Sequence, residues 1–213
     1  MKPVPFVPTV AEVSAEMAGE VPGLEAAVTL WTEGEYDAES WFREVNGSWG
    51  NAGYVMRRGE EVQGFVLYGP PERLPYAGNF PFDPPDGDAT LLASIGGDGR
   101  TRRHLLSRVM KDLKGRGVAG LEAIAADFAT RGHVPTPFLL ESGWRPLRHG
   151  WYGGRPYTLA RTDLGTTVEV GGLARGLIGR VRFPRLSPVP GATSGSFVRA
   201  RASAASLDTA RKT

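Results

Sequence analysis

The chain has 213 residues, 41% of them hydrophobic and 23% charged, with a formal net charge of +2. These values are those of an ordinary soluble globular protein, and the length predicts one well-cored domain with an appendage. No apolar run approaches the roughly 20 residues that span a bilayer, and the start of the chain lacks the apolar stretch of a signal peptide. The absence of cysteine excludes disulfides, thiolate metal sites and a cysteine nucleophile, so a cytoplasmic location is the default expectation.

The first part of the chain predicts two helices, a strand and a hairpin. Thr9 followed by Glu12 is a capping-box pattern, which predicts a short helix that opens at Thr9. The run AAVTLW at 26–31 predicts a strand, and the aromatic-rich segment 37–49 predicts a helix. Two strand-like runs within 53–69 flank a turn-forming Arg-Gly-Glu sequence, which is typical of a hairpin.

The second part alternates strands and helices after a long loop. Six prolines within residues 70–87 exclude a regular element there, and long ordered loops are often functional. The elements expected next are a strand over 88–95, a helix over 100–116, a strand over 118–126, a short helix over 136–142 and a closing pair of strands. This order predicts an α/β (α+β) fold with a mixed sheet and helices on its faces.

Residues 166–213 differ in charge from the rest of the chain. They hold eight basic and two acidic residues, a net charge of +6, whereas the remainder has a net charge of −4. Their Gly, Ala, Ser, Pro and Arg content is too poor in large apolar side chains to bury a core. We therefore expect a folded domain over 1–165 and a basic tail over 166–213 that is mostly disordered from about residue 187.

One stretch of this tail, residues 171–186, places apolar side chains at helical spacing among arginines. It could dock onto the acidic body, or it could bind nucleic acid or anionic lipid loosely and without sequence specificity. No motif of a specific nucleic-acid binder is present, and so no specific nucleic-acid partner is expected.

Five segments in this order resemble the GNAT superfamily of N-acetyltransferases, as a divergent member. They are YVMRRGEEVQGFVLYGPP, DATLLASI, LLSRVMKDLKGRGV, GLEAIA and FLLESGW, and the likeness covers residues 31–164. The resemblance implies a mixed, mostly antiparallel sheet flanked by helices. It also implies acetyl-CoA as cosubstrate and an amine as acceptor.

The resemblance also implies where acetyl-CoA binds. In that family the strands corresponding to 88–95 and 118–126 splay apart, and the pantetheine arm of the cofactor inserts between them. Here the backbone near Leu92, Ala93 and Ser94 would bind the arm. The pyrophosphate would lie on N–H groups that open the next helix, because unpaired donors and the helix dipole favour an anion there. The residues implied for it are Gly97, Asp98, Gly99, Arg100, Thr101, Arg102 and Arg103.

Two departures from the family pattern stand out. Arg100 and Arg102 take places where the family's phosphate loop has small residues, and Leu139 takes the place of the usual tyrosine acid. A side chain near the phosphates can obstruct the backbone cradle, but guanidinium can also bind phosphate directly. The arginines are therefore either phosphate ligands or solvated residues on the first turn of the helix.

Glu122 is the predicted catalytic base, because it lies in an otherwise apolar strand at the edge of the expected splay. Strand alternation leaves open that its side chain simply points to solvent. His133 and Tyr76 are substitutes on loops. No metal is expected, because the three histidines of the chain show no spacing typical of a metal site.

The predicted function is that of an acyl-CoA-dependent N-acetyltransferase that acts on an amine the sequence does not identify. The alternative is a catalytically degenerate GNAT-like module with a binding or regulatory role, which the missing tyrosine and the arginines of the loop favour. A homodimer is compatible with the sequence.

Overall fold

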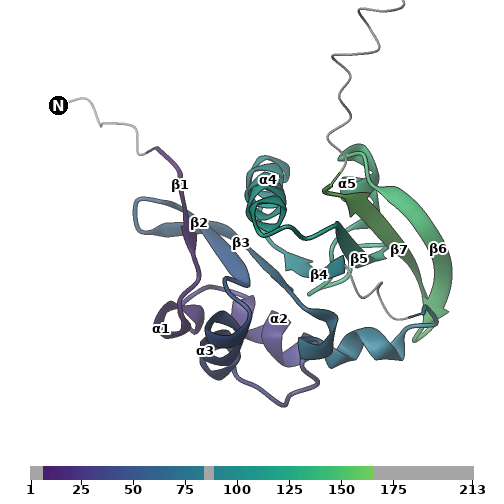
Figure 1. Cartoon of the computed structure of the whole chain (residues 1–213), viewed down its shortest axis with the longest axis horizontal. Helices are drawn as coiled ribbons and strands as arrows, with labels where there is room; N and C mark the ends of the chain where they lie inside the picture. Colours follow the sequence, from purple (N-terminus) through teal and green to yellow (C-terminus); the bar gives the residue numbers. More distant parts are fainter. Residues whose placement is uncertain (1–6, 84–88, 166–213) are drawn as a thin grey trace, which may run out of the picture. The chain divides into compact units, whose positions relative to one another are not determined.

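The computed structural model describes residues 7–83 and 89–165 (Figure 1). The tail predicted over 166–213, its order and its docking lie outside the described residues. The described strands form one seven-stranded sheet in the order β1-β2-β3-β4-β5-β7-β6. Their bounds are β1 (Thr9–Glu12), β2 (Gly53–Arg58), β3 (Glu61–Gly69), β4 (Ala89–Ile95), β5 (Gly120–Ala126), β6 (Arg145–Tyr152) and β7 (Arg155–Asp163).

The sheet is mixed and mostly antiparallel, as predicted. The pairs β1–β2, β2–β3, β3–β4, β5–β7 and β6–β7 are antiparallel, and β4–β5 is parallel. The predicted hairpin is confirmed as β2 and β3, which turn at Gly59 in the left-handed region (φ +63°). The parallel pair lies in the middle of the sheet and is the geometry on which the candidate site is built.

Helices cover both faces of the sheet. Their bounds are α1 (Ala15–Ala18), α2 (Leu24–Trp31), α3 (Ala38–Ser48), α4 (Gly99–Gly115) and α5 (Thr136–Glu141), with short 3-10 turns η1 (Pro71–Arg73) and η2 (Pro75–Asn79) in the proline-rich loop. One buried cluster joins α1, α2 and α3 to the sheet, and a second joins α4 and α5 to it. Figure 1 shows α4 on one side of the strands and α2 and α3 on the other. The parallel pair β4–β5 thus has a layer of helices on either face.

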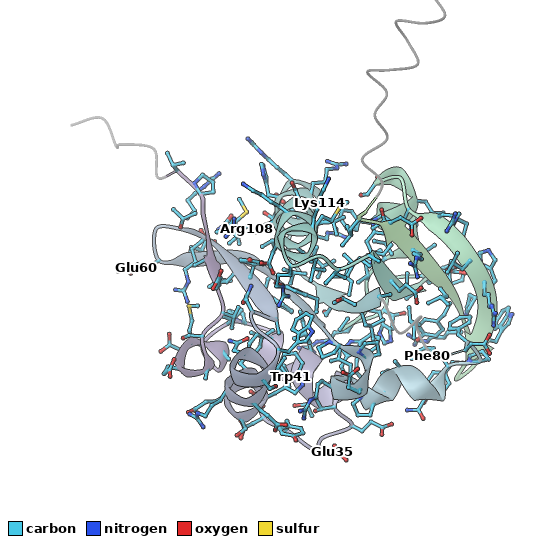
Figure 2. All side chains as sticks on the ribbon, viewed as in Figure 1. Glu35, Trp41, Glu60, Phe80, Arg108 and Lys114 are labelled. Atoms are coloured by element: carbon cyan, nitrogen blue, oxygen red, sulfur yellow. The ribbon has the colours of Figure 1, made fainter. Side chains whose placement is uncertain are left out.

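Helix α4 follows the predicted pattern closely. Leu105, Val109 and Leu113 are buried at helical spacing, and Gly117 follows the end of the helix at φ +76°. Figure 2 labels Arg108 and Lys114 on α4, and the Arg108 guanidinium carbon lies 5.1 Å from the centre of the Tyr54 ring of β2. None of the helices in the described part of the chain combines the length and apolarity needed to cross a membrane.

Two predictions in the first part of the chain are wrong. Residues 26–31 belong to α2, because Leu24, Val28 and Trp31 are buried together at helical spacing and override the strand-like character of AAVTLW. The Thr9 capping box is also not formed. Residues Thr9–Glu12 pair with β2, and Ser14 caps the short helix that follows.

Candidate active site

The parallel strands β4 and β5 pair only over their first three residues. Ala89, Thr90 and Leu91 pair with Gly120, Leu121 and Glu122, and the described sheet has no further β4–β5 pair. Beyond that point β4 pairs with β3 and β5 pairs with β7, except that Ala126 at the end of β5 also donates its N–H to the Val134 carbonyl of the following loop. The two inner strand edges are therefore left with backbone donors and acceptors that an extended ligand can bind.

A cavity of about 600 Å³ lies at the open end of this split. Its wall consists of residues from α2, β3, the end of β4, the start of α4 and the loop after β5: Gly23, Ala26, Ala27, Leu30, Phe65, Ser94, Ile95, Gly96, Gly97, Arg102, Thr130, Arg131, Gly132 and His133. Its volume lies within the range of small-molecule sites. Of the cofactor-binding residues predicted from the sequence, Ser94, Gly97 and Arg102 line it.

The other two residues predicted on β4 lie along the split without lining the cavity. Leu92 is buried in the cluster under α4, and Ala93 is buried in the cluster under α2. Their side chains pack in opposite layers, because successive residues of a strand point to opposite faces. Only their backbone atoms therefore face the split.

The connection from β4 to α4 is a short turn, Gly96-Gly97-Asp98, which packs directly against β3. Gly97 has φ +106°, and a Cβ atom there would lie 2.7 Å from the Gln63 carbonyl oxygen. A Cβ atom on Gly64 of β3 would collide with the Gly96 carbonyl oxygen. Glycine at these positions is thus required by close backbone packing, whether or not the turn also binds phosphate.

The start of α4 carries an anion of its own. An Asp98 carboxylate oxygen accepts a hydrogen bond of 2.7 Å from the backbone N–H of Thr101. Hydrogen bonds from the Thr101 backbone and side chain, followed by the Arg100 backbone, hold the pKa of Asp98 below its usual range. The backbone N–H groups of the first turn, predicted to bind pyrophosphate, therefore already donate to a carboxylate. A cofactor phosphate would have to displace this carboxylate or lie beside it.

The three arginines of the first turns point to different surroundings. Arg102 lines the cavity, its guanidinium carbon lies 5.4 Å from the centre of the Phe138 ring, and its buried Nε has no hydrogen-bond partner among the described residues. Arg100 is exposed and lines a separate hollow with Arg58. Arg103 is exposed and lies 4.0 Å from Glu141. Arg102 alone of the three is placed to meet a ligand in the cavity.

The loop from β5 to α5 forms another wall of the cavity; the sequence indicated His133 on this loop as a substitute base but not the contact of the loop with α2. The Trp31 indole N–H donates a hydrogen bond of 3.0 Å to the Gly132 carbonyl oxygen. Gly132 has φ +80°, and a Cβ atom there would lie 2.7 Å from Leu30 Cδ2. The TRGH sequence of this loop was a signal of a turn, but nothing in it indicated contact with α2.

His133 is buried at the end of this loop, with 7% of its surface exposed. Its Nδ1 lies 3.3 Å from the Arg131 carbonyl oxygen, and its buried Nε2 has no hydrogen-bond partner among the described residues. Burial lowers the pKa of His133 below its ordinary value of 6.5, and the contact with the Arg131 carbonyl opposes this shift. The imidazole is therefore neutral at pH 7.

Tyr76 lies beside His133 in an aromatic cluster. Its ring centre is 6.0 Å from that of His133 and 5.6 Å from that of Trp31. Figure 2 shows Phe80 of the same cluster beside the β6–β7 pair. Burial, followed by the neighbouring Tyr152, raises the pKa of Tyr76 to about 12, so its phenol stays protonated at neutral pH. The structure thus brings together the two substitute bases proposed from the sequence, though only His133 lines the cavity.

Glu122, the predicted base, lies where the β4–β5 pairing ends. It is 1% exposed, so strand alternation does not direct it to solvent. Its Oε1 lies 3.0 Å from Nη1 of Arg161, whose side chain is also largely buried. A Cβ atom on Gly120 would lie 2.7 Å from the Arg161 guanidinium, so this glycine leaves room for the ion pair. Glu122 does not line the cavity.

Leu139, at the place of the family's tyrosine acid, is fully buried on the inner face of α5. Neither this residue nor its neighbour Phe138 can transfer a proton. The described residues contain no group of three or more histidines and carboxylates that could hold a metal ion.

Comparison with known proteins supports the fold and goes no further. No protein-family model matches the chain, and no curated protein matches it. The structure is similar to that of an N-acetyltransferase from Staphylococcus aureus Mu50, with a TM-score of 0.53 and 13% identity over 74% of this chain and 99% of that one. It is also similar to an acetyltransferase of the GNAT family from Streptococcus pneumoniae, with a TM-score of 0.51 and 12% identity over 75% of this chain and all of the other. The resemblance predicted from the sequence is thus confirmed for the fold: the described part of the chain has the fold of the GNAT acetyltransferases.

Proposed function

We propose that the chain is an acyl-CoA-dependent N-acetyltransferase that moves an acetyl group from acetyl-CoA to an amine. The observation that carries this proposal is the split between β4 and β5, which continues into the cavity of about 600 Å³. Unpaired strand edges suit the two amide groups of a pantetheine arm, since each amide offers one donor and one acceptor. The similar folds of known acetyltransferases support the same assignment.

The donor would be held by the residues on the β4 side of the split. The backbone of Leu92, Ala93 and Ser94 would bind the arm, and Arg102 would bind a phosphate oxygen through its guanidinium, whose Nε has no hydrogen-bond partner among the described residues. The short turn and the Asp98 carboxylate leave less of a backbone cradle than a long glycine-rich loop would. Phosphate binding therefore depends more on guanidinium in this chain. Arg100 and Arg103 would act at longer range.

Transfer forms a bond between the amine nitrogen and the acetyl carbon and breaks the bond from that carbon to sulfur, which keeps the electron pair. The ammonium group loses two protons in all: the second leaves the nitrogen for solvent after the attack, and the first, which must leave before the attack, goes to a base. Glu122 remains the candidate for this role, and because it does not line the cavity it would act through an intervening water. With Leu139 in place of a tyrosine, the sulfur would leave as thiolate and take its proton from solvent.

Release of the free CoA thiol in the presence of a panel of amines tests the transfer. We expect time-dependent release that requires an amine, and we expect Glu122→Gln to lower the rate about 10²-fold or more while acetyl-CoA still raises the melting temperature. A folded Glu122→Gln variant with an unchanged rate would remove Glu122 from the mechanism. Asp163→Asn, which removes the exposed partner of Arg161, is the matched control.

A second candidate is a binding or regulatory module that has lost catalysis. Two observations favour it: Leu139 cannot act as an acid, and Asp98 occupies donors at the start of α4. This candidate predicts acetyl-CoA binding without amine-dependent thiol release.

A further inference from the structure

The wall of the cavity has an uneven charge. Its ionisable side chains are Arg102, Arg131 and His133, and no Asp or Glu is among the described residues that line it. A site for a polyamine or another polycation needs carboxylates to replace the water lost by the ammonium groups. The observed wall instead disfavours added positive charge and suits a ligand with a negative group.

We assign the acceptor to the wall of the cavity formed by α2, β3 and the β5–α5 loop, and call this wall the acceptor side; Arg131 is its cation. Arg102 belongs to α4 and lies over Phe138 of α5. The α4 side of the cavity is the one proposed for the donor phosphate. Arg131 lies on the β5–α5 loop, its side chain is exposed, and it has no ion pair among the described residues. A guanidinium in this position can bind a carboxylate through two parallel hydrogen bonds.

The backbone that carries Arg131 is held in place on both sides. Its carbonyl oxygen is 3.3 Å from His133 Nδ1, and the next carbonyl, that of Gly132, accepts the indole N–H of Trp31 at 3.0 Å. His133 and Trp31 also pack against each other, with ring centres 5.5 Å apart. An anchored residue with a free charged group loses less entropy on binding than one on a loose loop.

The rest of the acceptor side is apolar. Ala26, Ala27 and Leu30 of α2 and Phe65 of β3 face the cavity. A ligand there would be small, because the cavity of about 600 Å³ must also hold the end of the pantetheine arm. These features describe a small amine with an apolar part and an anionic group.

We infer that the acceptor is a small amine that carries a carboxylate, of the amino-acid class, and that Arg131 binds this carboxylate at the mouth of the cavity. The inference rests on the proposed acetyltransferase function. It assigns a specificity-determining residue to the loop that the structure adds to the site, and it excludes polycations as preferred acceptors.

The test compares L-leucine and L-phenylalanine with their amides and with spermidine as acceptors in the thiol-release assay. The amides carry less basic amino groups and are intrinsically easier to acetylate, so a preference for the free amino acids must come from the protein. We expect kcat/KM at least tenfold higher for the amino acids than for the amides or spermidine. Arg131→Gln should raise KM for the amino acids about tenfold or more, leave the amides unchanged, and be partly rescued by Arg131→Lys.

Equal or better use of the amides or of spermidine would overturn the inference, and so would an equal loss on all acceptors in Arg131→Gln. Turnover of other amines of the panel but of none of these would overturn it as well. Failure of the proposed function is a separate outcome: acetyl-CoA does not bind before an acceptor is added, or it binds without thiol release for any amine of the panel. A matched control is Arg155→Gln, an exposed arginine of β7 that does not line the cavity.

Discussion

Two connections meet at the open end of the split between β4 and β5, and they differ in how their polar groups are satisfied. The turn from β4 to α4 is short, packs against β3, and has its own carboxylate on the first N–H groups of the helix. The loop from β5 to α5 is longer and rests on α2 through Trp31. It presents an exposed Arg131 and a buried His133 Nε2 without a partner among the described residues.

This difference indicates a structural role for the first connection and a ligand-binding role for the second. Glycine and aspartate in the first connection are explained by packing and helix capping, so a ligand is not needed to account for them. The second connection leaves the buried Nε2 of His133 with no partner among the described residues, and a buried polar group without a partner is costly unless something binds it. The connection whose sequence most resembles a phosphate-binding loop is therefore the one whose residues are explained without a ligand.

The largest expected effect is on the packing of the first connection. Gly64→Ala should lower the free energy of unfolding by about 3 kcal/mol, because its Cβ would collide with the Gly96 carbonyl oxygen in the turn after β4. Gly99→Ala is the matched control, since a Cβ on this helical residue meets nothing within 4 Å. Urea denaturation measures both, and comparable losses in the two variants would contradict the packing role.

The next largest effect is on CoA affinity and concerns Arg102, which follows the first connection in α4. Arg102→Ala should weaken CoA binding by about 2 kcal/mol, the value of a charged hydrogen bond, and should weaken binding of a phosphate-free pantetheine analogue much less. Arg100→Ala should have a smaller effect, because Arg100 faces a different hollow. Calorimetry measures these affinities. Tighter CoA binding in Arg102→Ala would show that the side chain obstructs the site.

His133 makes the second connection sensitive to pH. Burial lowers the pKa of His133 in the folded protein, so the unfolded chain takes up a proton first as the pH falls. The stability that the neutral His133 contributes is fully present above about pH 6.5 and is lost as the pH falls below that value. The free energy of unfolding then decreases by at most about 1.4 kcal/mol per pH unit. Denaturation curves between pH 7 and 5 measure this slope.

His133→Asn should reduce the slope whatever its overall stability. Hydrogen bonds hold the pKa values of three carboxylates below 3.8, so these groups change the free energy of unfolding only at a lower pH than His133 does. They are Asp37, Asp98 and Asp163. An unchanged slope in His133→Asn would contradict the burial of a neutral imidazole.

The smallest effect is that of the helix cap. Asp98→Ala should lower the free energy of unfolding by about 1 kcal/mol, because the Thr101 N–H loses its acceptor. Asp98→Ser keeps an acceptor but removes the negative charge, so it should preserve stability and tighten CoA binding. Weaker CoA binding in Asp98→Ser would show that the carboxylate does not compete with phosphate.

Much of the fold could be predicted from the sequence, and the reasons lie in particular segments. Helix α4 has three buried residues at regular spacing and a glycine after its end, and the β2–β3 hairpin turns at Gly59. These are local signals. The α2 segment was taken for a strand because AAVTLW taken alone resembles one, and only the inclusion of Leu24 reveals the helical spacing.

The site was less predictable because its walls come together over long stretches of chain. Trp31 and Gly132 are hydrogen-bonded across 101 positions, and no local pattern indicates such a contact. The sequence also offers no means to decide whether glycines after a strand serve a ligand or a neighbouring strand. The contact between Gly64 and Gly96 answers that question for packing in this chain.

Thermal unfolding with and without millimolar acetyl-CoA tests the central claim, that the split between β4 and β5 is an acyl-CoA site, most directly. A ligand present at 100 times its dissociation constant stabilises the folded protein by about 2.7 kcal/mol. The account predicts a rise in melting temperature that corresponds to a stabilisation of this size. The shift should shrink in Arg102→Ala. No shift, together with no heat of binding in calorimetry, would contradict the account.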